Sequence, residues 1–307
     1  MIRKVLSILL AGVILLSTAA ALTSCGEDPE FPVKIGNITI NKEPKNIVIL
    51  DKNLSDIISA IGYDVKMVGR SDEVNQKALK VVPSMGTAQD PSVEKIKKEK
   101  AEIVFANDSL NKNDIAELKK AGIIVAQFHD ANTIKQLKSL YIKIGRMLGG
   151  NTEGKQAALK AYKEIKSTLE AVKTAARRDK TVSTLAYLYT DNGVLKSIID
   201  GSWASTLLDY TGSVNVFKTT DSDVVDIDKL LLANPDHIFV ADKSVKKYMK
   251  NSDVLGKLKA LDENTFVIPQ DELTLQGFTC LDVLEEMISK ITPQETETTQ
   301  SSEENAE

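Results

Sequence analysis

The sequence predicts an α/β protein with two mainly parallel-sheet lobes, one long rigid helix that joins them, and a ligand cleft between them. Three observations lead to this prediction. Short apolar runs alternate with helical patterns over residues 46–128, a long helical pattern follows Gly149 and Gly150, and the alternation resumes after residue 181. Such alternation is typical of parallel sheets covered by helices.

The first lobe is expected over residues 35–150. Its predicted strands are apolar and rich in β-branched residues, and its predicted helices carry apolar residues at three- and four-residue steps. Two helices should end at Gly62 and Gly122, because glycine adopts the left-handed conformation of a helix C-terminus without steric cost. The predicted strands cover residues 46–50, 66–69, 81–82, 102–106 and 123–128, and the predicted helices cover 54–61, 93–98 and 115–121.

A connecting helix is expected over residues 151–178. The segment contains no proline, and Ala158, Ile165, Leu169 and Val172 recur along one helical face. At 1.5 Å per residue it would span about 40 Å, the width of a domain. The sequence therefore predicts a stiff connector between the lobes.

The second lobe is expected over residues 179–292. Its strands are predicted at 181–189, 237–240 and 265–268, and its helices at 203–210, 228–233 and 278–291. Residues 293–307 are acidic and polar and contain no large apolar side chain. Because such a segment cannot contribute to a core, it is expected to be a disordered acidic tail.

The N-terminal segment predicts export. Residues 1–24 have a basic start and an apolar run, the layout of a secretory signal peptide. Leu22-Thr23-Ser24-Cys25 resembles a bacterial lipobox, which implies that Cys25 is lipidated and holds the protein on the outer face of the cytoplasmic membrane. The alternative is an ordinary signal peptide with a coincidental cysteine. Residues 25–34 then form a flexible spacer.

Composition excludes several classes of function. The formal net charge of −4 disfavours a nucleic-acid partner. Only His129 and His237 are present, and the chain has neither a Gly-x-Ser-x-Gly elbow nor a Cys-x-x-Cys pair, so no catalytic residue and no metal site is predicted. With Cys25 lipidated, Cys280 has no intramolecular partner and is expected to be a buried apolar group. An enzyme that uses carboxylates alone remains open.

Several motifs occur in an order that resembles one family. They lie at residues 44–50 with 57–62, 83–86, 92–96, 207–212 with 215–216, and 234–236. This order resembles the long-helix-linked substrate-binding proteins of ABC importers for iron-siderophores, haem and cobalamin. The resemblance implies a monomer that captures a small-molecule metal chelate or a corrinoid without turnover, needs no cofactor, and delivers the ligand to an ABC permease. A haem-binding member, a cleft-containing surface enzyme and an adhesin are the alternatives.

The resemblance also implies two permease-docking carboxylates. In this family an acidic residue on each lobe meets arginines of the permease. The positions correspond to Glu94 and to Asp228, where the family usually has glutamate. The alternative is that both are solvated carboxylates in the first turn of a helix.

The ligand-binding residues are predicted from the carboxyl ends of the strands, where ligands of open α/β sheets bind. Arg70 is the preferred contact for an anionic chelate, and Trp203 with Tyr189 could stack on a flat ligand or a cation. Arg70 and Trp203 are expected to close on one ligand from opposite lobes. His129 could ligate haem iron, although a single histidine at a strand end is more often structural. The predicted contacts are Arg70, Gln89, Asn107, Tyr189, Trp203, Asp242 and Gln270.

Overall fold

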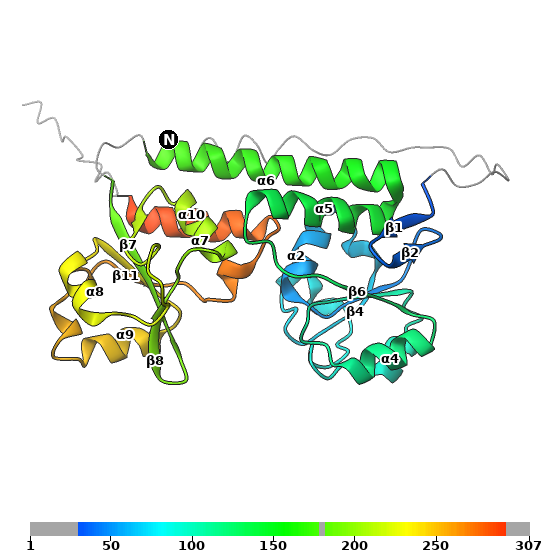
Figure 1. Cartoon of the computed structure of the whole chain (residues 1–307), viewed down its shortest axis with the longest axis horizontal. Coiled ribbons are helices and arrows are strands. Elements are labelled where there is room, and N and C mark those ends of the chain that lie inside the picture. The colour runs from blue at the N-terminus through cyan, green and yellow to red at the C-terminus, as the bar shows by residue number, and fades with distance from the viewer. Residues whose placement is uncertain (1–29, 178–181, 293–307) are drawn as a thin grey trace, which may run out of the picture.

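Two α/β lobes lie side by side beneath a layer of long helices (Figure 1). The structure is a computed structural model that describes residues 30–177 and 182–292. The fold class predicted from the sequence is confirmed. The predicted signal peptide, the lipidation site Cys25 and the predicted tail lie outside the described residues.

The first lobe contains a four-stranded sheet in the order β4-β3-β5-β6, with every pair parallel. β3 and β5 are buried along their whole length, because helices cover both faces of the sheet. The strands are β3 (Ile47–Ile49), β4 (Met67–Arg70), β5 (Ile103–Ala106) and β6 (Ile124–Gln127), and the helices are α2 (Lys52–Ile61), α3 (Val93–Lys98), α4 (Lys112–Lys120) and α5 (Ile134–Gly149).

The prediction of a strand at residues 81–82 is wrong. This segment ends a short 3-10 helix, η2 (Lys77–Val81), and a second 3-10 turn, η1 (Asp64–Lys66), precedes β4. Val81 is 88% exposed, so its apolar side chain packs on neither face of the sheet.

Part of the predicted flexible spacer belongs to the folded domain. Residues 33–35 form β1 (Val33–Ile35), which pairs antiparallel with β2 (Ile38–Ile40). Phe31 and Val33 are buried, and the Glu30 carboxylate accepts hydrogen bonds from the backbone N–H groups of Thr152 and Glu153. Residues 30–34 are therefore fixed to the helix layer rather than free.

The helix layer consists of α5 and α6 (Lys155–Ala176), which pack against each other around a π-helical turn, η3 (Gly150–Gly154). A Cβ atom at Gly154 would lie 2.0 Å from the carbonyl oxygen of Gly145, so only glycine permits this close approach. The connector predicted over 151–178 is thus a turn followed by one 22-residue helix. It starts above the first lobe and ends above the second (Figure 1).

The second lobe has the strand order β11-β10-β7-β8, with β9 also paired to β7. All pairs are parallel except β7–β8, a hairpin closed at Asn192 and Gly193, which both have positive φ. The strands are β7 (Thr184–Asp191), β8 (Val194–Ser197), β9 (Val214–Asn215), β10 (His237–Val240) and β11 (Thr265–Val267). The helices are α7 (Trp203–Tyr210), α8 (Ile227–Ala233), α9 (Lys243–Lys250) and α10 (Thr279–Ile291), with 3-10 turns η4 (Leu255–Lys257), η5 (Lys259–Leu261) and η6 (Glu272–Thr274).

Buried polar contacts join the two lobes beneath the helix layer. Asp56 of α2 accepts hydrogen bonds from Gly277 N (2.6 Å) and Thr279 Oγ1 (2.7 Å) at the start of α10. The side-chain amide of Gln276 exchanges two hydrogen bonds with the backbone of Ala131. One hydrophobic cluster runs through both lobes and the helices between them. The lobes therefore share a base as well as the connector.

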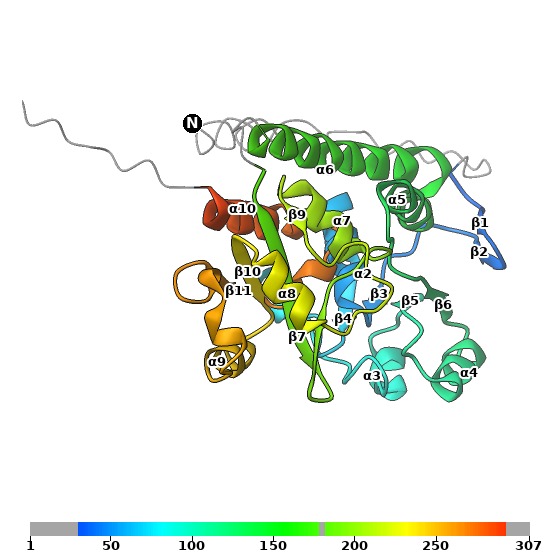
Figure 2. The same ribbon diagram turned by 60° about the vertical axis from the view of Figure 1, so that its left-hand side comes forward.

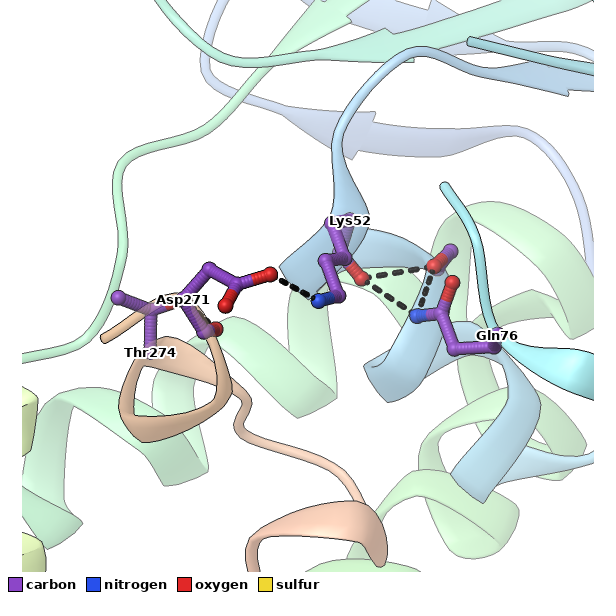
Figure 3. A network of polar contacts seen from close by, with 5 residues as sticks. Lys52, Gln76, Asp271 and Thr274 are labelled. Atoms are coloured by element: carbon purple, nitrogen blue, oxygen red, sulfur yellow. Dashed lines mark hydrogen bonds and ion pairs between the residues drawn. The ribbon is translucent and has the colours of Figure 1, made fainter. Parts of the chain in front are cut away.

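A further interlobe contact lies nearer the surface. Lys52 begins α2, and its Nζ lies 2.5 Å from Asp271 Oδ2 in the loop before η6 (Figure 3). Its carbonyl oxygen accepts a hydrogen bond of 2.9 Å from Gln76 Nε2. The start of α2 is thereby held from both lobes.

Candidate ligand cleft

A cleft of about 540 Å³ lies between the lobes. Its volume falls within the range of small-molecule sites, about 300–1,000 Å³. Both lobes contribute to its wall, since the first lobe supplies Asp130 and Asn132 and the second supplies the remaining residues. These are Tyr189, residues 197–204, residues 221–223, Gln270 and Thr274.

Polar side chains that follow three parallel strands lie at the edge of the first sheet, and one of them, Asp130, lines the cleft. Asp51 follows β3, Asn107 follows β5 and Asp130 follows β6, so the carboxyl ends of these strands bring them to one edge. Asn107 Nδ2 donates to Asp51 Oδ2 at 2.6 Å. Asn53 Nδ2 donates to Asp130 Oδ1 at 2.6 Å, and the carbonyl oxygen of that buried amide has no hydrogen-bond partner among the described residues.

Two of these carboxyl groups have raised pKa values. Removal from water and the nearby charge of Asp130 raise the pKa of Asp51 to about 6, although its hydrogen bonds from Leu54 N and Asn107 oppose the rise. Partial removal from water likewise raises the pKa of Asp130. The edge of the first sheet therefore carries two carboxyl groups that are protonated more readily than free aspartates.

Two aromatic side chains line the second-lobe side of the cleft. Tyr189 lies on β7, and its hydroxyl is 3.4 Å from Asp223 Oδ2. Trp203 begins α7 and is only 3% exposed, and its Nε1 donates a hydrogen bond of 2.7 Å to the carbonyl oxygen of Leu275. This bond fixes the indole plane, so one wall of the cleft is a rigid apolar surface.

Comparison with known proteins identifies the family. The model of the periplasmic binding protein family matches residues 47–272, which include the greater part of both lobes. The chain belongs to the periplasmic binding protein family. This confirms the resemblance inferred from the sequence motifs. It also makes the chain a transport substrate-binding protein and not an enzyme.

Individual relatives agree with this assignment. The chain is 26% identical to the uncharacterized ABC transporter substrate-binding lipoprotein YvrC of Bacillus subtilis, over 91% of this chain and 95% of that protein. It is 30% identical to the Fe(3+) dicitrate-binding periplasmic protein FecB of Escherichia coli, over 42% of this chain and 45% of FecB. Its fold is similar to that of a possible iron-binding (periplasmic solute-binding) protein of Staphylococcus epidermidis, with a TM-score of 0.71, 16% identity, and coverage of 82% of this chain and all of that one.

Three of the residues predicted from the sequence of this binding protein line the cleft: Tyr189, Trp203 and Gln270. The other polar candidates, Gln89, Asn107 and Asp242, are not in its wall. Asn107 supports the first-lobe edge through its bond to Asp51, and Asp242 caps α9 by accepting hydrogen bonds from Ser244 and Val245. Gln89 is exposed in the loop before α3.

The structure does not bring Arg70 and Trp203 to one cleft. The guanidinium of Arg70 donates from Nε to the carbonyl oxygen of Leu79 at 3.1 Å and from Nη1 to that of Ser71 at 3.0 Å. These main-chain acceptors hold the side chain within its own lobe. The predicted contact between Arg70 and an anionic chelate therefore has no geometric support.

His129 does not line the cleft either. Its Nδ1 lies 2.7 Å from Asp108 Oδ2, and both side chains are largely exposed. Within residues 30–177 and 182–292, no group of three or more His, Cys, Asp and Glu side chains could hold a metal ion. Cys280 is buried in α10.

Sequence reasoning missed the acidic residues of the cleft. Asp130 directly follows His129, which the strand-end rule did select, so the same rule could have found it. Asp221 and Asp223 lie in a Thr-Thr-Asp-Ser-Asp stretch between β9 and α8, where a short run of acids was the available signal. Asp200 follows β8, a strand that was not predicted.

The two predicted docking carboxylates lie on exposed helix starts. Glu94 is in the first turn of α3 and Asp228 is in the first turn of α8, and the caps of these helices are Ser92 and Asp226 instead. Neither Glu94 nor Asp228 forms an ion pair or a hydrogen bond through its side chain in the part of the chain that the structure describes. Figure 2 shows α3 and α8 in different lobes, both below α6.

Among the helices that the structure describes, none is long and apolar enough to cross a membrane.

Proposed function

We propose that this substrate-binding protein of an ABC importer captures an iron chelate or a corrinoid in the cleft and delivers it to a permease. The observation that carries the proposal is the composition of the cleft wall: Asp130 comes from one lobe, and Tyr189, Trp203 and Gln270 come from the other. A ligand bound there would contact both lobes at once. The name of the relative YvrC supports a role in ABC transport, and the name of FecB supports an iron compound as the ligand.

The proposed mechanism is recognition without chemical change. The lobes share a hydrophobic cluster and the buried Asp56 contacts, so separating or closing them widely would disrupt packed side chains. Ligand binding therefore requires only small adjustments around the cleft. The surface that contacts the permease would then be determined mainly by the positions of the rigid helices α3 and α8.

The docking surface is proposed to include a third residue. Leu232 lies one helical turn after Asp228 on α8 and is 90% exposed. Residues four apart on a helix share one face, so a carboxylate and an apolar side chain are presented together. Glu94 supplies the corresponding carboxylate of the first lobe.

We further propose that the protein is extracytoplasmic and held on the outer face of the cytoplasmic membrane through lipidated Cys25. The lipobox and the description of YvrC as a lipoprotein support this anchor.

The sole tryptophan of the chain makes the binding proposal directly testable. Because Trp203 lines the cleft, a bound ferric chelate or corrin should quench nearly all of the indole fluorescence. The full-length protein should be titrated with ferric hydroxamates, ferric dicitrate, haem and cobalamins, and each ligand should be recovered unchanged afterwards. Saturable quenching by one class, with a rise in melting temperature, supports the proposal. Absence of saturable quenching by every class would contradict it.

A further inference from the structure

We infer that the cleft selects a ligand whose cleft-facing groups are cationic or uncharged and that it disfavours an anionic chelate. The inference rests on the proposed function, since it concerns the charge of the compound that the protein carries. Of the described residues that line the cleft, none is a lysine, an arginine or a histidine. Four are aspartates, namely Asp130, Asp200, Asp221 and Asp223.

One cation lies beside these carboxylates, but it is already shared. Lys196 Nζ lies 3.3 Å from Asp223 Oδ2 and 2.9 Å from Asp191 Oδ2. Asp191 is not part of the cleft wall, so a single ammonium group faces two carboxylates. Lys196 can partly offset the charge of Asp223, and it forms no ion pair with the other three aspartates in the described part of the chain.

The other neighbouring cations are paired with carboxylates outside the cleft. Lys218 Nζ lies 2.5 Å from Asp209, and Lys52 Nζ lies 2.5 Å from Asp271. The Arg70 guanidinium is bound to main-chain carbonyl oxygens of its own lobe. None of these three groups lines the cleft, and the charges of Lys218 and Lys52 are already offset by their carboxylate partners.

Three carboxylates of the cleft wall consequently have no lysine or arginine partner among the described residues. In the described part of the chain, Asp130 accepts a hydrogen bond only from the neutral amide of Asn53, and the side chains of Asp200 and Asp221 form no ion pair. A ligand carboxylate or catecholate would add negative charge beside them. A ligand ammonium group, or amide and hydroxyl donors, would instead supply the partners that these oxygens lack.

The aromatic residues of the cleft wall also favour a positively charged ligand. Tyr189 and Trp203 line the cleft together with the aspartates. The faces of aromatic rings carry negative charge density and attract cations, most strongly when water is excluded. Tyr189, the more exposed of the two aromatic side chains, therefore adds to the preference of the carboxylates for a cationic ligand.

The test compares ligands that differ in one charge. Ferrioxamine B carries a protonated amine on its arm, its N-acetyl derivative is uncharged there, and its N-succinyl derivative is anionic. For corrins, the equivalent series is aquocobalamin at mildly acidic pH, cyanocobalamin and a cyanocobalamin monocarboxylate. The full-length protein should be titrated with both series, with quenching of Trp203 as the measurement.

We expect affinity to fall from the cationic to the neutral to the anionic member of the series that binds. Each step should be about fivefold, the Coulomb energy of charges several ångströms apart at a protein surface, and smaller in high salt. The double variant Asp200→Asn with Asp221→Asn should reduce these ratios. Asp253→Asn is the matched control, because it removes the same charge from an exposed loop outside the cleft wall.

The possible results separate the two proposals. Equal or tighter binding of the anionic member, or ratios unchanged in the double variant, would overturn the charge inference while transport of a chelate or corrinoid stands. Tight binding of ferric dicitrate, the ligand in FecB's name, would do the same. If neither series nor ferric dicitrate binds, the proposed function fails, and the inference fails with it.

Discussion

Asp51 should make the protein less stable as the pH rises through the weakly acidic range. The carboxyl group caps α2 through Leu54 N at 2.7 Å and accepts a hydrogen bond from Asn107, yet removal from water and the charge of Asp130 raise its pKa from 3.8 to about 6. The folded protein therefore retains a proton that the unfolded chain releases above pH 3.8. Its stabilising effect is complete below that pH and is lost as the pH rises through about 6.

The size of the effect follows from the difference between the pKa of Asp51 in the unfolded chain and its pKa in the folded protein. A difference between 3.8 and about 6 corresponds to about 3 kcal/mol in the free energy of unfolding. Asp51→Asn removes the titrating group and keeps a residue that also caps helices well. The wild-type protein should lose about 3 kcal/mol relative to the variant between pH 3.8 and pH 7.

The assay is urea denaturation of both proteins across this pH range. Other carboxyl groups also titrate, but the difference between the two proteins isolates Asp51. Asp253→Asn serves as a control for the loss of an exposed carboxylate. Parallel stability curves for wild type and Asp51→Asn, or a wild type that gains stability relative to the variant as the pH rises, would refute the reasoning.

Four other substitutions test separate parts of the molecule. Cys25→Ala should release the protein from the membrane fraction, and undiminished membrane association after cell fractionation would exclude the anchor. Glu94→Ala and Asp228→Ala should lower uptake with ligand affinity nearly unchanged, whereas a parallel loss of binding in fluorescence titrations would place them in the cleft or the fold. Gly277→Ala should cost about 1–3 kcal/mol in urea denaturation, because its Cβ would lie 2.4 Å from the carbonyl oxygen of Asp56. Gly256→Ala, whose Cβ would meet nothing nearer than 3.7 Å, should be nearly neutral, and equal costs for the two would contradict the packing argument.

The fold could be predicted from the sequence because its main signals are local. Buried parallel strands such as β5 are continuous apolar runs, and α6 shows an uninterrupted helical period. The hairpin of β7 and β8 was missed although Asn192-Gly193 is a strong turn signal, because Val194–Ser197 is short and only partly apolar. The hydrogen bonds that place residues 30–34 on the helix layer join positions more than a hundred residues apart, and no local pattern reports them.

The site was only partly predictable. The strand order indicates which residues lie at the ends of strands, but it does not indicate the direction in which their side chains point. Tyr189, Trp203 and Gln270 were found from the strand-end rule and from the scarcity of tryptophan. Arg70 met the same criteria, but its direction is set by the carbonyl oxygens of Leu79 and Ser71, a tertiary contact. The acidic character of the cleft depends on which aspartates lack a lysine partner, and that pairing is decided only by the folded structure.

The contact between α2 and the start of α10 affects how the protein folds during synthesis. Gly277 packs against Asp56 so closely that no side chain fits between them, and Cys280, Leu284 and Met287 of α10 belong to the cluster that also contains Ile57 and Ile58 of α2. The first lobe leaves the ribosome before the last helix does. Until that helix arrives, an apolar surface of the first lobe stays uncovered and is open to chaperones and proteases. The two lobes should accordingly unfold as one cooperative unit, and a chain cut before α10 should yield no stable first lobe.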